Sequence, residues 1–431
     1  MGYFEEYDLD SRFKSVLSSW NPVRGYYHVV LDWDQRRAIS VSTPGEKDDE
    51  FVFEALEELV DDLPDDVVHI KVSEDFHLLS SSTAVEDDNT MIPFYPSPTD
   101  FPPRLPTVRR DQLTEIDRLG VQTDHTVYEL GPGQPPKHVV FKYYLNEGNI
   151  AMFWHEINCT LRIPAHPNIV PFDRLVVDSA TPGSPEKVVG FTTPFVAGGT
   201  ILDNVSRIFK LDHLKQLTTT IDYLNLQLGI VHGDICLWNL LIDVETDQLK
   251  IFDFNMGAKL GWEGDEAHQG VYGYDEDRND VKLAIFTLYE LITRDLSFRE
   301  ENYPHELDAA VVLAMPAWEP HPDVRLEEGV EVAEYRRVLE EWVAKRKEVD
   351  AGFGSYEQAP ESIDWPSLPE FPVVEFVGSM TKRQSQMRQE MIKRGEPFMK
   401  WQRPPTRRLP LPEGQRLLAT GEIIRDGPKE G

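Results

Sequence analysis

The chain has 431 residues, 40% of them hydrophobic, so it can bury a large core and hold one catalytic unit with additions. Its formal net charge of −32 argues against general binding to nucleic acid or to anionic membranes. The sequence has no apolar run of about 18 residues and no signal peptide. Its only two cysteines, Cys159 and Cys236, suit a reducing compartment. We therefore expect a cytoplasmic or nuclear protein.

Residues 1–90 are predicted to form a small acidic α/β unit. The runs YYHVVLDWD (26–34), RRAISVST (36–43) and VVHIKVS (67–73) are rich in β-branched and aromatic residues, which is typical of strands. An acidic stretch near residues 50–63 predicts a helix with one solvated face. The pattern does not indicate a role for this unit.

A proline-rich linker is predicted at residues 91–107, which include most of the string IPFYPSPTDFPPRLPTV. It separates the acidic unit from a larger domain, predicted at residues 108–345, that carries the chemistry. Residues 346–431 then form a proline-rich and basic tail. Within this tail, MTKRQSQMRQEMIKRG (380–395) predicts a basic helix, which we expect to dock onto the acidic chain itself; binding to a partner is the alternative.

Two elements near the start of the larger domain place charged residues. HVVFKYY (138–144) has the composition of a strand and carries Lys142. NIAMFWHEINCTLRI (149–163) predicts a helix in which Glu156 is the only acidic residue. Further on, GFTTPFVAGGTI (190–201) predicts a strand that ends in a glycine turn.

The strongest signal is HGDICLWN at 232–239, followed by KIFDFN at 250–255. Two short apolar runs separated by the polar stretch VETDQ predict a hairpin between the two motifs. This hairpin would fold Asp253 back beside Asp234 and Asn239. Phosphoryl transfer from Mg·ATP needs such a set, because one carboxylate orients the acceptor hydroxyl and oxygen ligands hold Mg²⁺ against the phosphates.

Two helices are predicted around these motifs. In LDHLKQLTTTIDYLNLQLGI (211–230), leucine and isoleucine recur on one stripe, as in a helix that faces a core. NDVKLAIFTLYELIT (279–293) has no charge between Lys282 and Glu290, so we expect a helix buried on all sides.

In these motifs the chain resembles the eukaryotic protein kinase family, whose catalytic loop is usually HRD with Asn five residues after the Asp, followed by DFG. HGD, DFN and YDEDRNDVKLAIFTLYELITRD are more specifically similar to a group of kinase-like proteins from filamentous fungi. The resemblance implies an α+β, bilobal protein-kinase-like fold with a small β-rich lobe, a helical lobe and Mg·ATP bound between them.

The resemblance also implies roles for individual residues. Asp234 would orient the acceptor hydroxyl, and Asn239 and Asp253 would bind Mg²⁺. Asp280 would support the catalytic loop from below. The residues expected to bind ATP are Gly120, Val127, Val140, Lys142, Glu156, Thr193, Pro194 and Val196. Among these, Lys142 would contact phosphates and pair with Glu156, Thr193 would be the gatekeeper, and residues 194–196 would form the hinge.

Several positions depart from the family pattern. In LGVQTDHTVYEL (119–130) only Gly120 remains of the phosphate-covering G-x-G-x-x-G loop, and Gln122 and His125 replace the other glycines. Cys236 replaces the usual lysine. Asn255 replaces the glycine of DFG, a change we expect to be mild because asparagine tolerates left-handed backbone.

The activation segment also differs. Residues 254–279 contain no Ser or Thr, the APE motif is absent, and Gly233 replaces the arginine that would receive an activating phosphate. The common phosphothreonine switch is therefore chemically excluded.

Three functions follow from the sequence. The first is an ATP-dependent phosphotransferase, most readily a protein kinase acting on Ser or Thr. The second is a small-molecule kinase, because aminoglycoside and choline kinase relatives also have HGD with Asn five residues later. The third is a pseudokinase that binds nucleotide or partners without turnover, which the altered glycine loop favours.

Overall fold

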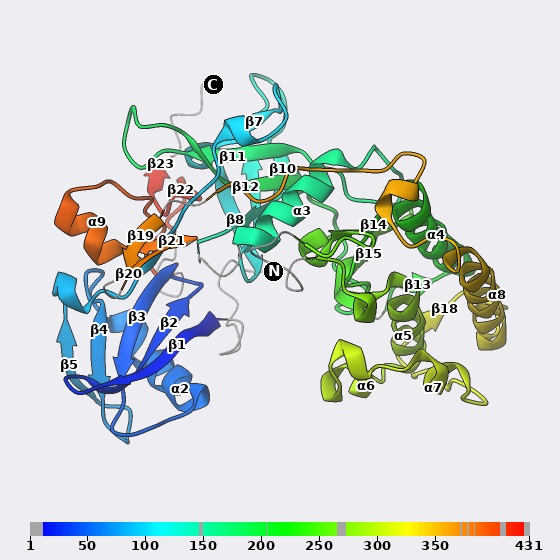
Figure 1. The fold of residues 1–431 in the computed structure, drawn as a ribbon, viewed down its shortest axis with the longest axis horizontal. Helices are drawn as coiled ribbons and strands as arrows, with labels where there is room; N and C mark the ends of the chain where they lie inside the picture. Colours follow the sequence, from blue (N-terminus) through cyan, green and yellow to red (C-terminus); the bar gives the residue numbers. More distant parts are fainter. Residues whose placement is uncertain are drawn as a thin grey trace. The chain divides into compact units, whose positions relative to one another are not determined.

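The computed structural model describes residues 12–425, except residues 146–149, 205, 265–272, 371–372, 377–378, 383 and 406–410 and the side chains of residues 371–383. The chain divides into two compact units. Unit 1 comprises residues 1–150, 173–195 and 369–431, and unit 2 comprises residues 151–172 and 196–368. Both contain helices and strands, in agreement with the predicted α+β class (Figure 1). The division does not follow the predicted domain boundaries.

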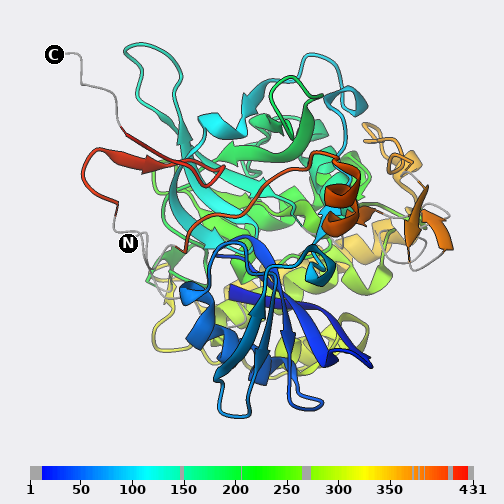
Figure 2. The same ribbon diagram turned by 90° about the vertical axis from the view of Figure 1, so that its left-hand side faces the viewer.

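Unit 1 begins with a five-stranded sheet in the order β1-β2-β3-β4-β5 (Figure 2). Neighbouring strands are antiparallel except β3 and β4, which are parallel and connected through helix α2. The strands predicted at the N-terminus are therefore present, together with one strand on either side of them. The elements are β1 (Phe13–Asn21), β2 (Gly25–Asp32), β3 (Arg37–Ser42), α2 (Asp49–Leu59), β4 (His69–Val72) and β5 (Leu78–Ser82).

Helix α2 covers one face of this sheet. Asp48 caps the helix by accepting a hydrogen bond from the backbone N–H of Phe51 at 3.1 Å, and acidic residues in the first turn complement the helix dipole. Its apolar side packs on alternate strand residues, which form one buried cluster that includes Val30, Ile39, Val41, Phe53 and Leu56. The acidic residues thus solvate the other side, as predicted.

A second sheet in unit 1 has six strands in the order β7-β11-β12-β10-β9-β8. All neighbours are antiparallel except β7 and β11. The bounds are β7 (Thr107–Arg109), β8 (Thr114–Gly120), β9 (Thr123–Tyr128), β10 (Lys137–Tyr143), β11 (Arg174–Asp178) and β12 (Lys187–Pro194). The end of the predicted linker is therefore a strand of this sheet.

A buried ionic network connects the two sheets of unit 1. Arg36, in the turn between β2 and β3, forms ion pairs with Glu115 of β8 and Asp124 of β9. Arg403, from the C-terminal segment, pairs with Glu115 and with Asp34. Each of these side chains is at most 5% exposed. Removing one partner would leave a buried charge uncompensated, so the network fixes the register of segments from both ends of the chain.

The C-terminal segment adds further short elements to unit 1: β19 (Val373–Phe376), β20 (Ser379–Lys382), β21 (Ser385–Met387), α9 (Arg388–Arg394), β22 (Gln415–Leu417) and β23 (Ile423–Arg425). The predicted helix at 380–395 is wrong in its first half, because β21 instead pairs with β6 (Met91–Pro93), inside the predicted linker. The basic residues Arg388 and Arg403 form ion pairs with Asp88 and Asp34, so this part of the tail docks on the chain itself.

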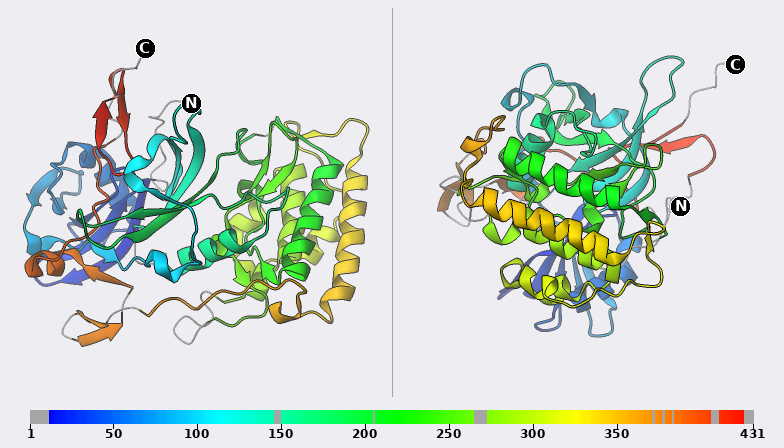
Figure 3. Two further views of the ribbon diagram at one scale, coloured as in Figure 1. Left: turned by 90° about the horizontal axis from the view of Figure 1, so that it is seen from above. Right: turned by 90° about the vertical axis from the view of Figure 1, so that its right-hand side faces the viewer.

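Unit 2 is mainly helical. Its helices are α3 (Ile150–Arg162, whose first residue is the last of a unit 1 range), α4 (Leu211–Asp222), α5 (Asp280–Thr293), α6 (Ser297–Glu301), α7 (Ala309–Leu313) and α8 (Val332–Asp350). Figure 3 shows α4 and α8 running alongside each other. Short two-stranded sheets join β13 (Ile208–Phe209) to β18 (Arg325–Leu326), β14 (Ile230–Val231) to β17 (Ala258–Lys259), and β15 (Leu240–Ile242) to β16 (Leu249–Ile251).

Helix α5 forms the centre of the core of unit 2. Asn279 caps it by accepting hydrogen bonds from the backbone N–H groups of Val281 and Lys282, and the left-handed Arg294 ends it. Every residue from Leu283 to Ile292 is buried, which confirms the prediction of a helix surrounded by protein. Among the residues that the structure describes, no helix is long and apolar enough to cross a membrane.

Candidate functional site

The predicted hairpin in unit 2 brings the two motifs together. β15 and β16 are antiparallel with Leu240 opposite Ile251, and the backbone N–H of Phe252 donates to the carbonyl of Asn239 at 3.3 Å. Asp253 therefore directly follows Phe252, whose backbone is hydrogen-bonded to that of Asn239.

Asp234 and Asn239 are in direct contact. The side-chain amide of Asn239 donates at 2.9 Å both to the carboxylate Oδ2 and to the backbone carbonyl of Asp234. This pair of bonds fixes the orientation of the Asp234 carboxylate. Because Asn239 uses its nitrogen as the donor, its Oδ1 is the atom that can face a cation.

Asp253 has backbone angles φ 69° and ψ 72°, in the left-handed region that non-glycine residues rarely adopt. His232 supports this bend, because its Nε2 donates to the carbonyl of Phe252 at 2.8 Å and its ring packs 4.7 Å from that of Phe254. Strain of this kind gathers at functional sites. Asn255, which replaces the glycine of DFG, lies in a 3₁₀ turn and does not have a positive φ, so its side chain meets no left-handed strain there.

Asp280 supports the backbone of the loop that carries Asp234. Its buried carboxylate accepts hydrogen bonds from the backbone N–H groups of His232 at 2.9 Å and Gly233 at 2.8 Å, and from the Asn225 side chain at 2.8 Å. Arg346 of α8 in turn donates to Asn225 at 3.1 Å. A chain of side chains thus connects the long helix α8 to the loop.

A second support was not predicted from the sequence. Thr287 and Arg299 both donate to the carbonyl of Ile235, at 2.9 Å and 3.0 Å. Arg299 is held by an ion pair with the buried Glu290 at 2.6 Å, although burial raises the pKa of that carboxyl. No motif marks Arg299, since it approaches the loop from a separate helix, α6.

Gly233 occupies a position that no other residue fits. Its φ is +76°, and a Cβ atom there would lie 2.5 Å from the carbonyl oxygen of Met256. The arginine found at this position in the protein kinase family would therefore not fit this backbone.

Gly233→Ala should lower the free energy of unfolding by about 1–3 kcal/mol, because the left-handed backbone and the close carbonyl both oppose a side chain. Equilibrium denaturation measures this loss. Gly352→Ala is the matched control, because its added Cβ would meet only one atom, at 3.9 Å. Equal stability of Gly233→Ala and wild type would show that the loop has another conformation.

Cys236 lies in the same loop but is fully buried, and its thiol donates to the carbonyl of Asp234 at 3.2 Å. Burial raises the pKa of the Cys236 thiol well above its usual range. Cys236 therefore has a structural position and stays a neutral thiol at physiological pH.

Four predicted ATP-binding residues share one face of the six-stranded sheet in unit 1. Val140 of β10 lies directly opposite Thr193 of β12, and Val127 of β9 lies opposite His138, two residues from Val140 on the same face. Lys142 follows on this face because side chains alternate along a strand. All four are half-buried, whereas Val139, Phe141 and Tyr143 point to the buried core on the other face.

The hairpin that would cover phosphates is short. Gly120 pairs with Thr123, so only Val121 and the left-handed Gln122 form the turn between β8 and β9. The backbone carbonyl of Gln122 accepts a hydrogen bond from the Tyr143 N–H at 3.0 Å. This turn therefore bends back onto strand β10.

His125 fills the place of the third glycine of the loop. Its ring stacks on that of Phe195 with centroids 3.8 Å apart, and its Nε2 lies 2.9 Å from Nδ1 of His138. Burial, with a contribution from His138, lowers the pKa of His125 to about 4. The ring is therefore neutral at pH 7 and would bring no positive charge to a phosphate.

The remaining predicted residues are distributed over both units. Pro194 ends β12 in unit 1, whereas Val196 and the buried Glu156 of α3 belong to unit 2. Lys142 belongs to unit 1 and Glu156 to unit 2, and their pairing stays a prediction. The activation segment lies partly outside the described residues, at 265–272.

A strap, residues 353–366, packs on three parts of unit 2 near the motifs. Backbone N–H groups of Tyr356 and Ile363 donate to the carbonyls of Leu260 at 2.8 Å and Leu228 at 2.9 Å. At helix α3, Trp154 donates through Nε1 to the carbonyl of Pro366 at 2.8 Å. The strap thus contacts α3, the turn before β14 and the segment that follows Asp253.

Lys259 is buried where the strap meets the segment after Asp253. Its ammonium pairs with Asp364 of the strap at 2.8 Å and lies 4.2–5.3 Å from three ring centroids. The rings belong to Trp262, Tyr356 and Trp365. Such cation–π contacts are strongest where the cation is desolvated, so this cluster fixes the strap in place.

Among the described residues, no three His, Cys, Asp or Glu side chains gather as a metal site. A magnesium ion bound with ATP does not need such a group, because one or two protein oxygens, phosphates and water complete its coordination. An amide oxygen from Asn239 and a carboxylate from Asp253 fit that donor set.

Comparison with protein-family models gives no match to this chain, and neither does comparison with curated proteins.

Proposed function

We propose that the chain is an ATP-dependent phosphotransferase of the bilobal protein-kinase type that acts on Ser or Thr hydroxyl groups of proteins. The carrying observation is the Asp234–Asn239 pair, in which the amide of Asn239 orients the carboxylate at 2.9 Å. In this proposal Asp234 accepts the hydrogen bond of the attacking hydroxyl and receives its proton.

The other roles follow from chemistry. Asn239 Oδ1 and the Asp253 carboxylate would hold Mg²⁺, which neutralises charge on the transferred phosphoryl group. Lys142 would contact the phosphates. Because three supports fix the loop backbone, through Asp280, Thr287 and Arg299, the rate would come mainly from positioning and electrostatics.

Binding of the nucleotide is the first test. ATP with Mg²⁺ should raise the melting temperature of the full chain, and ATP without Mg²⁺ should raise it less. No shift at millimolar nucleotide would contradict the proposal.

A pseudokinase is the second candidate, favoured by the tight two-residue turn between β8 and β9 and by the neutral His125. Both reduce the donors that a glycine loop would offer to phosphates. A small-molecule kinase fits the HGD motif and the missing APE motif equally well. Nucleotide binding without transfer to either peptides or small hydroxyl compounds would favour the pseudokinase.

The proposed activity should not depend on phosphorylation of the activation segment. Tyr272 and Tyr274 are its only hydroxyl-bearing side chains, and Gly233 replaces the arginine that in the kinase family would receive an activating phosphate. Protein made in bacteria and protein from the native host after phosphatase treatment should therefore have equal turnover. A large loss on dephosphorylation, traced to Tyr274, would contradict this expectation.

The strap offers a physical reason why activity would not depend on phosphorylation. It packs against α3 and against the segment after Asp253 without any phosphate. Lys259→Met should break the ion pair with Asp364 and increase hydrogen exchange in residues 150–162 and 258–262. Lys345→Met, an exposed residue of α8, is the control. Unchanged exchange in both segments would remove this role from the strap, whether or not the chain proves to be a kinase.

A further inference from the structure

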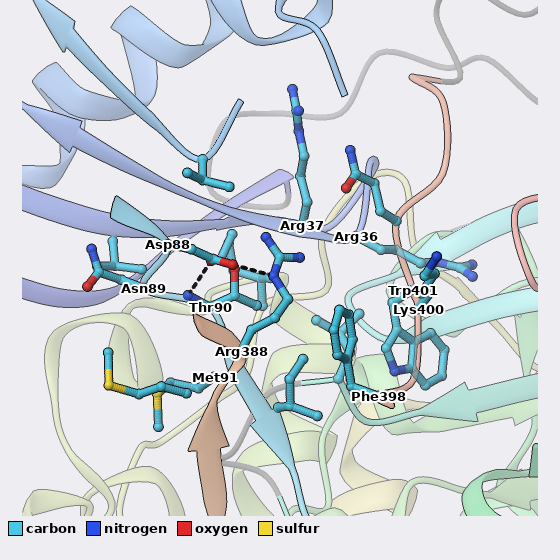
Figure 4. Close-up of a pocket in the computed structure, with 18 of the residues that line it drawn as sticks. Arg36, Arg37, Asp88, Asn89, Thr90, Met91, Arg388, Phe398, Lys400 and Trp401 are labelled. Atoms are coloured by element: carbon cyan, nitrogen blue, oxygen red, sulfur yellow. Dashed lines mark hydrogen bonds and ion pairs between the residues drawn. The ribbon is translucent and has the colours of Figure 1, made fainter. Parts of the chain in front are cut away.

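The five-stranded sheet of unit 1 uses its second face to line a cavity of about 870 Å³ (Figure 4). Strand residues form one wall, and β6, β21, the start of α9 and residues 398–404 form the others. The volume lies within the range of about 300–1,000 Å³ that is common for small-molecule sites. None of the predicted ATP-binding residues lines it.

Much of the wall is apolar. Its apolar side chains include Val29, Leu31, Met91, Ile92, Met387 and Phe398. Methionine side chains adapt to ligands of irregular shape because they are unbranched and polarisable. This composition favours a ligand with an extended apolar part.

Three arginines beside the cavity already have partners. Arg36 and Arg403 are engaged in the buried ionic network. Arg37 donates to the carbonyls of Val60 and Pro64, both at 3.1 Å. In Figure 4 its guanidinium points away from that of Arg388. The terminal nitrogens of all three are therefore engaged within the protein.

Arg388 differs from them. Its Nε donates to Asp88 at 2.5 Å, and Asp88 is itself fixed by the N–H of Thr90 at 3.0 Å. Within the described part of the chain, the two terminal nitrogens of Arg388 have no hydrogen-bond partner. A guanidinium oriented in this way presents a donor fork to a carboxylate.

The charges near this fork favour an anion. Lys400, whose side chain is exposed, also lines the cavity and forms no ion pair among the described residues. The carboxylate of Asp88 is already engaged by Arg388, while Asp65 and Asp66 are exposed to solvent, which screens them. In a chain with a net charge of −32, Arg388 and Lys400 thus place two cations at this apolar cavity.

We propose that this cavity binds a monocarboxylate with an extended apolar chain, of the fatty-acid class. The chain would lie along the sheet face, and the carboxylate would accept hydrogen bonds from both terminal nitrogens of Arg388, with Lys400 as a second cation. This site is independent of the proposed phosphotransferase.

Calorimetric titration of the full chain with decanoate and with decanol, both below their aggregation limits, tests the site. Decanoate should bind saturably at one site, and decanol about tenfold or more weakly, because it lacks the charge-assisted hydrogen bonds. Arg388→Met should remove the preference for the acid and leave decanol binding unchanged. The exposed Arg337→Met on α8 is the control for the loss of one positive charge.

Arg388→Met leaves Asp88 buried without its cation, so the double variant Asp88→Asn/Arg388→Met, which removes both charges, accompanies it. Decanol binding by that variant reports an intact cavity. Equal affinity of wild type for decanoate and decanol, absence of decanoate binding, or a preference for the acid that survives in the double variant would each overturn the proposal.

Discussion

Asp234→Ala should reduce phosphoryl transfer by about 10²–10⁴-fold, the range expected for loss of a positioned general base, while ATP still binds. The reason is geometric, because the carboxylate that Asn239 orients at 2.9 Å would face the acceptor hydroxyl rather than the nucleotide. Steady-state kinetics should therefore show the loss in kcat, with little change in KM for ATP.

The matched control is Asp323→Ala, which removes an exposed carboxylate of unit 2 outside the motifs. It should behave as wild type. Full activity of Asp234→Ala would remove this residue from the reaction, and an equal loss in both variants would show that the assay reports stability rather than catalysis.

Asp253→Asn should abolish the Mg²⁺-dependent part of ATP binding. The substitution removes one negative charge from the proposed metal site but keeps the shape of the side chain, and asparagine is among the residues that best tolerate the left-handed backbone at φ 69°. Thermal unfolding without ligand should therefore match wild type. The extra stabilisation that Mg²⁺ adds to ATP should disappear.

Thermal shift measurements with ATP, with and without Mg²⁺, provide the readout. Asp247→Asn, an exposed carboxylate in the turn between β15 and β16, is the control for the charge change. A Mg²⁺ response in Asp253→Asn as large as that of wild type would exclude Asp253 as the main ligand.

Local patterns predicted two secondary-structure elements of the candidate site. The two apolar runs around VETDQ do form the antiparallel hairpin between the two motifs. The uncharged stretch before Glu290 does form the buried helix α5. These features depend on neighbours in sequence, so periodicity and turn composition are enough to find them.

The supports of the site depend on contacts between distant residues. No local sequence pattern marks these supports, because each uses an ordinary charged or aromatic residue. They are Arg299, the link from Asn225 to Arg346, and the strap around Lys259. The left-handed backbone of Asp253 was not predicted either, because no local pattern marks an aspartate with positive φ.

The two ends of the chain were predicted least well. The tail sequence has the charge pattern of a helix, but β6 offers a free edge that pairs with residues 385–387 and shortens the helix to Arg388–Arg394. Arg36 and Arg403 likewise find Glu115 across long sequence distances. Strand pairing with a distant segment thus overrides the helix propensity of residues 385–387, where the predicted helix has only a weak apolar stripe.

Transfer of the γ-phosphoryl group of ATP tests the central claim most directly. Purified wild-type chain with Mg·ATP should phosphorylate Ser or Thr in a peptide library, detected by mass spectrometry, and Asp234→Ala should give no signal above background. A wild-type chain that binds Mg·ATP but phosphorylates no peptide would contradict the account.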